Sequence, residues 1–467
     1  MEPLTLALAL IAVLLILRSK PLTGLFIYLA LLCWYSAWQP VTILGIHLTG
    51  PRMVMPFLLW RCARDPLIKR RFRWMAIDTA VIVLAAAEVA AGFATTSLDQ
   101  LLQNRAGAFF DTSMVYFTVR LAVMTEAEYV RFFKGLIAIA APLAFFGVYQ
   151  AVTGSNPWGV FVNQGQMFEG ATVINDWVEN SKRLGFYRAS VNFPYSITFG
   201  FFFALIGAVA AGAWYYVSGR RRRVFVIGLC IMLVGMLSSM SSGPILAGGT
   251  AVVVTMGWPF RRYWKLFVGG LVLCLVAIEI GSNRHWYDVL GWYLAFNRAT
   301  AGYRIALIEE TFNGGMTGHW AVGYGLVSPS NIAEIVANWK HTDITNHFVY
   351  EVMRFGLVGF IPWAAVMALA IARLRKGFRT AVSLQQQWVA WCIGAGICAT
   401  LASMMSACWE GQPYNLFWAV LGLAANAPLM ARSALPAIDP RLLAARAARM
   451  RQGIPVAAYR GGGMPRG

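Results

Sequence analysis

The sequence contains few charged residues for its length. Asp, Glu, Lys and Arg make up 13% of the 467 residues, whereas a soluble domain carries about 25%. Hydrophobic residues account for 58%, and the chain has 18 Trp, 17 Tyr and 29 Phe. Aromatic side chains at this frequency are typical of helices anchored at lipid headgroups. The composition therefore excludes a string of soluble domains and predicts an all-α polytopic integral membrane protein.

Acidic residues are scarcer than basic ones, with 20 Asp and Glu against 39 Lys and Arg and a net charge of +19. In a soluble chain this balance suggests nucleic-acid binding, but here the basic residues interrupt apolar runs. We therefore expect the lipid bilayer as a partner, and no nucleic acid. Because basic residues favour cytoplasmic loops, the clusters indicate which loops face inward. They fall at Arg18/Lys20, Lys69–Arg73, Arg131/Lys134, Arg220–Arg223, Arg261/Arg262 and Arg373–Arg379.

Cysteine is present without the spacing of a disulfide framework or a zinc site. All seven cysteines lie in or beside apolar runs, and none forms a CxxC pair. A free Cys in such a run behaves as a small hydrophobic residue. The Gly-Lys-Ser/Thr ending of a nucleotide-binding P-loop is also missing. We therefore expect no cofactor and no metal centre built on cysteine.

The apolar runs predict about 12–13 transmembrane helices, because each span needs about 20 apolar residues. The first run has no basic residue before it and is followed by Arg18 and Lys20. This order is the reverse of a signal peptide, so we expect a retained helix. The candidate runs are 3–17, 22–38, a weak one at 51–63, 77–95, 106–124, 132–152, 193–217, 224–239, 243–260, 266–281, 348–372, 388–409 and 416–430.

Two segments between the spans are too long for simple turns, and both fall on the side opposite to the basic clusters. Long polar loops often carry function, whereas the Ala-, Arg- and Gly-rich tail is expected to be disordered. The expected division is N-terminal transmembrane helices (1–153), a first long outer loop (154–192), central helices (193–281), a large outer loop forming a helical subdomain (282–346), C-terminal helices (347–431) and a basic cytoplasmic tail (432–467).

The first outer loop ends with two arginines, Arg183 and Arg188, just before a span. A guanidinium is planar, binds phosphate oxygens with two N–H groups and keeps its charge at neutral pH. The pair could therefore hold a lipid-linked diphosphate. The alternative is that both arginines pair with lipid phosphate or with Asp176 and Glu179 of the same loop.

The second outer loop contains a helical pattern over residues 302–312, with Arg304 near its start. A glycine-rich turn follows at 314–325 and contains His319. The glycines would let the backbone approach a ligand closely. We treat Arg304 as a candidate binding residue and His319 as a secondary one.

His347 stands where a predicted helix enters the membrane, and Glu351 follows one turn later on the same face. A carboxylate in this position would orient the imidazole and raise its basicity, as a general base requires. Two alternatives are an interfacial histidine bonded to backbone or lipid, and a metal site formed with His341 and Asp343. The spacing of these three residues matches no standard metal motif.

Glu88 is an ionisable residue in the middle of a predicted span. Such residues are usually functional or paired. Glu88 is therefore a secondary candidate, either as a proton-relay group of a transporter or as the partner of an arginine on a neighbouring helix.

Taken in order, these features resemble the O-antigen ligase and O-antigen polymerase superfamily of bacterial cell envelopes. The resemblance covers Lys182 to about Leu374 as a pattern of sparse residues. It rests on Arg183-Leu184-Gly185-Phe186, Asn192-Phe193-Pro194, Ser238-Ser239-Met240-Ser241-Ser242-Gly243-Pro244, Tyr303-Arg304, Gly323-Tyr324-Gly325, Asn346-His347-Phe348-Val349-Tyr350-Glu351 and Phe355-Gly356-Leu357-Val358-Gly359.

The resemblance implies a fold like that of the C-type membrane glycosyltransferases, in the bacterial inner membrane, with its site facing the periplasm. It implies transfer of a glycan from undecaprenyl diphosphate to an acceptor without nucleotide sugar or required metal. Arg183, Arg188 and Arg304 match the family's diphosphate-binding arginines, and His347 matches its loop-end histidine. The family commonly has Ser-Arg-Gly where this chain has Ser241-Ser242-Gly243, and its adjacent Pro-Asn pair is separated here.

The residue types then suggest a mechanism. The arginines would stabilise the charge that grows on the leaving diphosphate, and His347, supported by Glu351, would take the acceptor proton and favour inversion. The acceptor is another lipid-linked unit in a polymerase, which we favour, and lipid A core or protein in a ligase. A transporter or lipid-linked glycan flippase that uses Glu88 is the alternative from a different class, and an assembly scaffold is a third. Candidate stacking faces for sugar rings are Trp158, Trp177, Trp286, Trp292 and Trp320.

Overall fold

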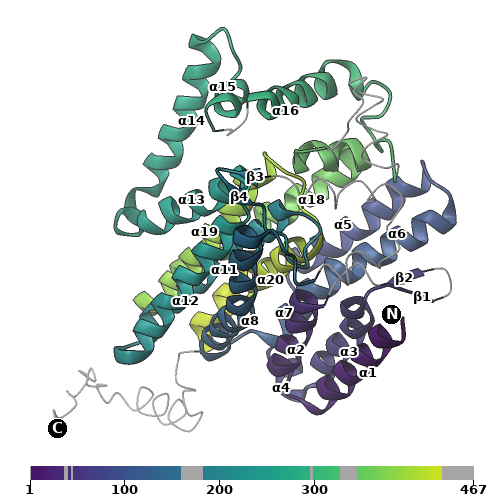
Figure 1. The fold of residues 1–467 in the computed structure, drawn as a ribbon, viewed down its shortest axis with the longest axis vertical. Coiled ribbons are helices and arrows are strands. Elements are labelled where there is room, and N and C mark those ends of the chain that lie inside the picture. The colour runs from purple at the N-terminus through teal and green to yellow at the C-terminus, as the bar shows by residue number, and fades with distance from the viewer. Residues whose placement is uncertain are drawn as a thin grey trace, which may run out of the picture.

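A computed structural model describes residues 2–35, 40–43, 46–158, 182–294, 298–326 and 344–433. Within these ranges the chain is helical apart from two short antiparallel hairpins, and the helices pack side by side as a bundle (Figure 1). The expected tail and parts of both outer loops lie outside the described residues, among them Asp176, Trp177, Glu179, His341 and Asp343.

The first part of the chain contains seven longer helices, one short helix (α4) and the β1–β2 hairpin. These are α1 (Glu2–Arg18), α2 (Pro21–Trp34), β1 (Val41–Ile43), β2 (Ile46–Leu48), α3 (Gly50–Arg64), α4 (Pro66–Arg71), α5 (Ala76–Phe93), α6 (Leu98–Asp111), α7 (Ser113–Ala122) and α8 (Glu126–Thr153).

The remainder begins with the second hairpin and ends with the central helix of the bundle. It comprises β3 (Lys182–Arg183), β4 (Phe186–Tyr187), α11 (Ser196–Ala210), η1 (Ala211–Tyr216), α12 (Gly219–Ser238), α13 (Ser242–Met256), η2 (Trp258–Tyr263), α14 (Trp264–Gly281), α15 (Trp286–Leu294), α16 (Arg298–Glu310), η3 (Thr311–Gly315), α18 (His347–Thr380), α19 (Leu384–Met404) and α20 (Gly411–Ser433).

Six helical segments are long and apolar enough to cross a membrane, as expected for a polytopic membrane protein. They are Ala76–Phe93, Glu126–Thr153, Ser196–Tyr216, Trp258–Gly281, His347–Thr380 and Leu384–Met404. Three shorter apolar helices accompany them, at Pro3–Arg18, Pro21–Trp34 and Ser242–Met256. The all-α architecture is as predicted, while the finer count of about 12–13 spans remains a prediction.

The run at 106–124 differs from its expected form, because it is divided between α6 and α7. The break falls at Thr112, whose φ of −116° and ψ of −77° interrupt the helix. Asp111 immediately precedes the break and binds the guanidinium of Arg52 on α3 at 2.6 Å. A polar side chain with a fixed partner thus stands where an uninterrupted apolar span was expected.

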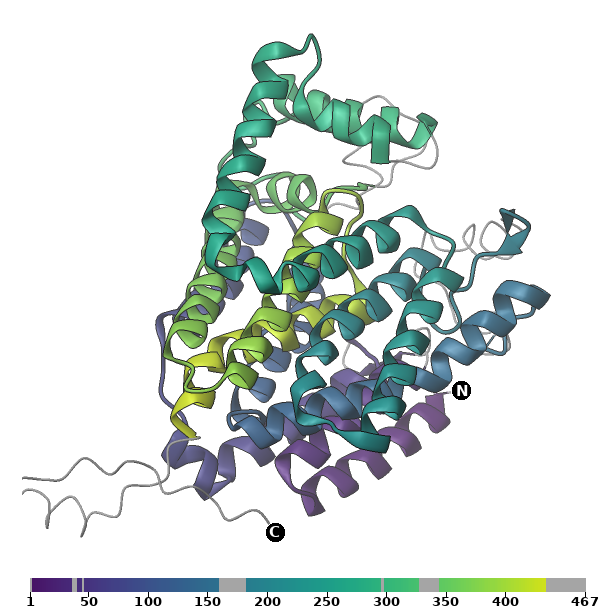
Figure 2. The same cartoon turned by 90° about the vertical axis from the view of Figure 1, so that its left-hand side faces the viewer.

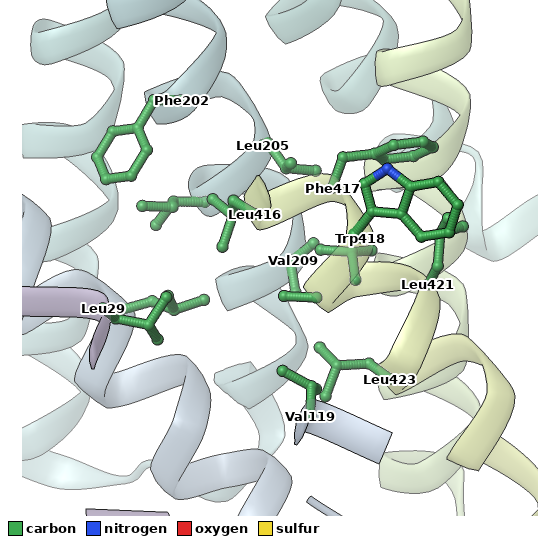
Figure 3. Packing of buried hydrophobic residues seen from close by; sticks show 14 of the residues in the cluster. Leu29, Val119, Phe202, Leu205, Val209, Leu416, Phe417, Trp418, Leu421 and Leu423 are labelled. Carbon is green, nitrogen blue, oxygen red and sulfur yellow. The ribbon is translucent and has the colours of Figure 1, made fainter. Parts of the chain in front are cut away.

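The apolar core surrounds α20, which is buried along most of its length. Leu416, Phe417 and Trp418 pack among side chains of neighbouring helices, including Leu205 of α11 and Val119 of α7 (Figure 3). A helix that is apolar on all sides is stable only inside a protein core or a bilayer. By contrast, α14 has no buried residue and stands apart from the bundle in both views (Figures 1 and 2).

A buried cation joins three helices at the end of the bundle opposite to His347. Arg120 of α7 is fully buried, lies 3.3 Å from Asp78 of α5, donates to the carbonyl of Arg73 at 2.8 Å and contacts Asn426 of α20. Tyr116 donates a further hydrogen bond to Asp78 at 2.7 Å. Pairing with a carboxylate and several hydrogen-bond acceptors is what allows a charge to lie between apolar helices.

The helix α18 is broken at Gly356, and the glycine-rich turn fills the break. Gly356 has φ 59° and ψ −161°, so the backbone groups on either side lose their helical partners. The amides of Tyr324 and Gly325 donate to the carbonyls of Met353 and Arg354 at 2.8 and 3.0 Å. In return, the amides of Leu357 and Val358 donate to the carbonyls of Trp320 and Ala321 at 2.8 and 3.0 Å.

The glycine-rich turn therefore approaches another part of the backbone, and not a ligand as its composition suggested. Gly323 has φ +71°, and a Cβ atom on it would lie 2.6 Å from the carbonyl oxygen of Met353. Only glycine fits this approach without strain. The turn thus supplies partners to four backbone groups at the break, which a bilayer would not do.

Replacement of Gly323 with alanine should destabilise the protein. The left-handed conformation alone costs a residue with a side chain about 1–2 kcal/mol, and the overlap with α18 adds to this. We expect a lower melting temperature in detergent for Gly323→Ala. The control is Gly302→Ala on α16, where an added Cβ meets nothing within 4 Å; equal melting temperatures for the two variants would contradict the role of the turn.

Candidate active site

His347 opens α18 and is almost completely buried. Asn346 caps this helix, because its side-chain oxygen accepts from the amides of Phe348 and Val349 at 3.0 and 3.2 Å. Nδ1 of His347 accepts from the backbone amide of Trp409 at 3.4 Å. Nε2 lies 3.4 Å from Oε1 of Glu351 one turn later. The structure thus brings together the predicted histidine and carboxylate, on the face that the sequence indicated.

The contacts of His347 fix the tautomer of its neutral ring. Since Nδ1 receives an N–H group from Trp409, the ring proton belongs on Nε2, which faces Glu351. The second oxygen of Glu351, Oε2, has no hydrogen-bond partner among the described residues. Nε2 of His347, although 3.4 Å from Oε1, also makes no hydrogen bond among these residues, so the couple keeps one donor and one acceptor available.

The couple lines a cavity of about 600 Å³ enclosed by α3, α5, α6, α18 and α20. This volume lies in the range of about 300–1,000 Å³ that is usual for small-molecule sites. The cavity wall carries five carboxamides and five large aromatic side chains, namely Gln100, Gln103, Asn104, Gln412 and Asn415 with Tyr35, Tyr350, Phe355, Trp409 and Tyr414. Amides that can both donate and accept, beside aromatic faces, suit a ligand with many hydroxyl groups.

Two of the arginines in the cavity wall form ion pairs with carboxylates of the same wall. Arg105 on α6 binds Glu88 on α5 at 2.6 Å, which confirms the expectation that Glu88 pairs with an arginine of a neighbouring helix. Arg52 and Asp111 form the second pair at 2.6 Å. Arg354 on α18 has no ion pair within the described part of the chain; it donates to Asn104 at 3.1 Å.

Sequence reasoning did not identify Arg52, Arg105, Asp111 or Arg354. A signal was present for Arg354, because it follows His347 by seven residues and Glu351 by three, and so shares their helix face. Arg52 lies on α3 and the other two on α6, and the sequence gives no indication that these helices meet.

The two first-loop arginines lie at the β3–β4 hairpin, an element that the sequence did not indicate: Arg183 is in β3 and Arg188 directly follows β4. Leu184 and Gly185 form its turn with φ of 53° and 85°, which is typical of a tight hairpin. Arg183 donates to the carbonyl of Met240 at 3.3 Å, and Arg188 donates to the hydroxyl of Ser241 at 2.9 Å. Burial and the neighbouring Arg183 lower the pKa of Arg188 to about 10, so it stays charged at neutral pH.

Two contacts connect the hairpin region to the cavity. Gln412, which lines the cavity, donates to the carbonyl of Asn192 at 3.4 Å. Trp409, whose amide reaches His347, stacks on Phe201 of α11 with ring centroids 4.9 Å apart. The arginine hairpin and the His347–Glu351 couple therefore lie at the same end of the bundle.

Arg304 and His319 are not among the residues that line the cavity. Arg304 lies on α16, whose Leu307 packs against Val349 and Met353 at the start of α18. His319 stacks on Tyr324 with ring centroids 4.1 Å apart, so it belongs to the glycine-rich turn.

Two further sequence hypotheses concern metal and tryptophan. Among the described residues, no group of three or more His, Cys, Asp and Glu side chains could hold a metal ion; His341 and Asp343 lie outside these residues. Trp158 packs against Trp34 and Phe146, which makes it part of an aromatic cluster and not an open stacking face.

A scan of the chain against protein-family models finds no match, and a search of curated proteins finds none either.

Replacement of Glu88 with glutamine should destabilise the protein by about 1–3 kcal/mol, because it leaves the partly buried Arg105 without its ion pair. The measurement is the free energy of unfolding in detergent. The double variant Glu88→Gln/Arg105→Gln removes both charges and should recover most of the loss. If the single variant is as stable as the unaltered protein, the pair has no structural role.

The hairpin should lose affinity for anions at a lower pH than an ordinary arginine site. Because the pKa of Arg188 is lowered to about 10, its charge is present below that pH and is lost as the pH rises through it. Binding of inorganic pyrophosphate, measured by calorimetry between pH 8 and about 11, should weaken across this window. The Arg188→Gln variant should bind more weakly and show no such fall; an identical fall in the variant would assign it to another group.

Proposed function

We propose that the protein is a membrane glycosyltransferase that moves a glycan from a lipid-linked diphosphate to an acceptor hydroxyl, as in the polymerisation of an envelope polysaccharide. The main support is the buried His347–Glu351 couple, which opens onto a polar cavity inside a bundle of apolar helices. A membrane protein retains such a cavity only when polar groups or a polar ligand occupy it. The resemblance to the O-antigen ligases and polymerases supports the same reaction.

The hairpin arginines would receive the diphosphate of the donor. When the bond between C1 of the sugar and the phosphate oxygen breaks, its electron pair stays on the diphosphate. Arg183 and Arg188 would stabilise this charge, and both already point their guanidinium groups at hydrogen-bond acceptors of the Met240–Ser241 turn. Fixed cations in a partly dehydrated site act more strongly than in water. Arg304 would assist from α16.

The His347–Glu351 couple would receive the proton of the acceptor. As the acceptor oxygen forms its bond to C1, its proton passes to Oε2 of Glu351, which has no hydrogen-bond partner among the described residues. Nε2–H of His347 would hold the carboxylate in place. Attack on the face opposite to the leaving diphosphate inverts the configuration at C1. No nucleotide or metal is needed for this balance of bonds and charges.

The arrangement also favours a location in the bacterial inner membrane with the site facing the periplasm. His347, the arginine hairpin and the cavity lie at one end of the bundle, whereas Arg120 and the basic cluster near Arg73 lie at the other. Positively charged ends face the cytoplasm. Lipid-linked glycans awaiting polymerisation are presented on the opposite face.

A transporter or flippase is less well supported than a transferase. A transporter that relays protons through Glu88 needs a free carboxylate there, but this side chain is ion-paired with Arg105 at 2.6 Å. A proton relay at this position would have to break a buried pair at each cycle. A ligase uses the same donor chemistry and differs in its acceptor.

His347→Ala and Glu351→Gln should each lower glycosyl transfer by at least about 100-fold, as expected for loss of a general base or of the group that positions it. The assay measures elongation of a lipid-linked oligosaccharide by the purified protein in nanodiscs. His285→Ala is the matched control, because His285 is exposed and pairs with Glu279 away from the cavity. Full transfer activity in both His347→Ala and Glu351→Gln would contradict the proposed function.

A further inference from the structure

An apolar groove of about 280 Å³ runs between α5 and α6 and meets the polar cavity. Its wall is formed by Leu84, Ala85 and Val89 of α5 and by Leu101 and Leu102 of α6, among others. Glu88, Arg105 and Thr112 belong to both the groove and the cavity. The two spaces therefore form one amphipathic path, apolar at one end and polar at the other.

Two arginines stand where the groove meets the cavity. Arg105 and Arg354 both donate to Oδ1 of Asn104, at 2.6 and 3.1 Å. Both guanidinium groups also lie over the ring of Phe355, at 4.7 and 5.5 Å from its centroid. Two cations held this close repel each other unless anions offset their charge.

Three glutamates, Glu88, Glu351 and Glu410, line the cavity with these arginines. Glu88 forms an ion pair with Arg105, and Glu351 faces His347. Arg354 has no ion pair, and Nε of both arginines lacks a hydrogen-bond partner, within the part of the chain that is described. The junction is thus suited to an additional anionic group, which an arginine pair would bind through several N–H donors.

We propose that this junction is the seat of the acceptor, a second lipid-linked saccharide. Its polyprenyl chain lies in the α5–α6 groove, its phosphates bind Arg105 and Arg354, and its glycan enters the polar cavity. This inference rests on the proposed function, and assigns the acceptor to residues that neither the resemblance nor the donor site uses.

The position of His347 and Glu351 determines which substrate occupies this seat. The couple lines the cavity and not the hairpin, and the group that loses a proton is the acceptor hydroxyl. In the transfer, the bond from C1 to the donor diphosphate breaks, the bond from C1 to the acceptor oxygen forms, and the proton goes to the couple. The glycan in the cavity is therefore the acceptor.

The shape of the groove further defines the acceptor. A single slot between two helices suits one polyprenyl chain, whereas lipid A carries several acyl chains side by side. The seat therefore favours a polymerase, which joins two lipid-linked units, over a ligase.

The inference is tested by counting lipid diphosphates on the full-length protein. The probe is undecaprenyl diphosphate, added to the protein in phosphatidylcholine nanodiscs and detected by native mass spectrometry. We expect two molecules per chain. Ala85→Phe, which fills the groove, and Arg354→Gln, which removes a charged donor, should each weaken binding at one seat by tenfold or more.

Ala86→Phe is the matched control for the groove, because Ala86 is exposed on the same helix and does not line the groove. It should leave both molecules bound. The double variant Arg183→Gln/Arg188→Gln should remove the other molecule and leave the groove occupied. A single bound molecule that is insensitive to Ala85→Phe overturns the inference, as does equal displacement by phosphatidylglycerol, which would indicate an ordinary lipid site.

The number of bound lipid diphosphates and the rate of glycosyl transfer test the two proposals separately. Transfer that persists in His347→Ala and Glu351→Gln contradicts the proposed reaction, whatever number of lipids is bound. Transfer that depends on both residues, together with one bound diphosphate per chain, contradicts the acceptor seat alone. Since His347→Ala leaves Arg105 and Arg354 intact, it should still bind two molecules.

Discussion

The structure depends on one constraint, which is that a bilayer offers no hydrogen bonds to a polar group. Polar groups inside the bundle must therefore find partners within the protein. Arg120 is surrounded by Asp78, Asn426 and a backbone carbonyl, and Arg105 by Glu88 and Asn104. The constraint concentrates polar side chains at a few positions, so a polar cavity in an otherwise apolar bundle is a candidate region for function.

The same constraint explains how α18 can be both a long apolar helix and the support of the site. His347, Glu351 and Arg354 share one face over two turns, and the helix breaks at Gly356 directly after them. The amides and carbonyls released by the break bind the glycine-rich turn. The large outer loop is in this way attached to the backbone that carries the site, and the break orients the first two turns separately from the rest of the helix.

The sequence predicts those parts of the protein that depend on local pattern. The long apolar helices, the hairpin arginines and the His347–Glu351 couple follow from composition and helical spacing. The interruption at Thr112 does not, because the partner of Asp111 is Arg52, 59 residues earlier in the chain. The glycines at 314–325 indicate a close approach, but only the fold shows that the approaching group is the backbone of α18. Contacts between distant helices are the information that local pattern lacks.

The two arginine pairs differ in a way that matches two chemical tasks. Arg183 and Arg188 contact a carbonyl and a hydroxyl, and neither has an ion pair within the described residues. Their full charge is available to an anion that gains negative charge during the reaction. Arg105 is already neutralised by Glu88, so the cavity pair has about half of that charge to offer. In the proposed reaction, a site of this kind would suit the diphosphate of the acceptor, which stays unchanged, and the stronger field would act at the bond that breaks.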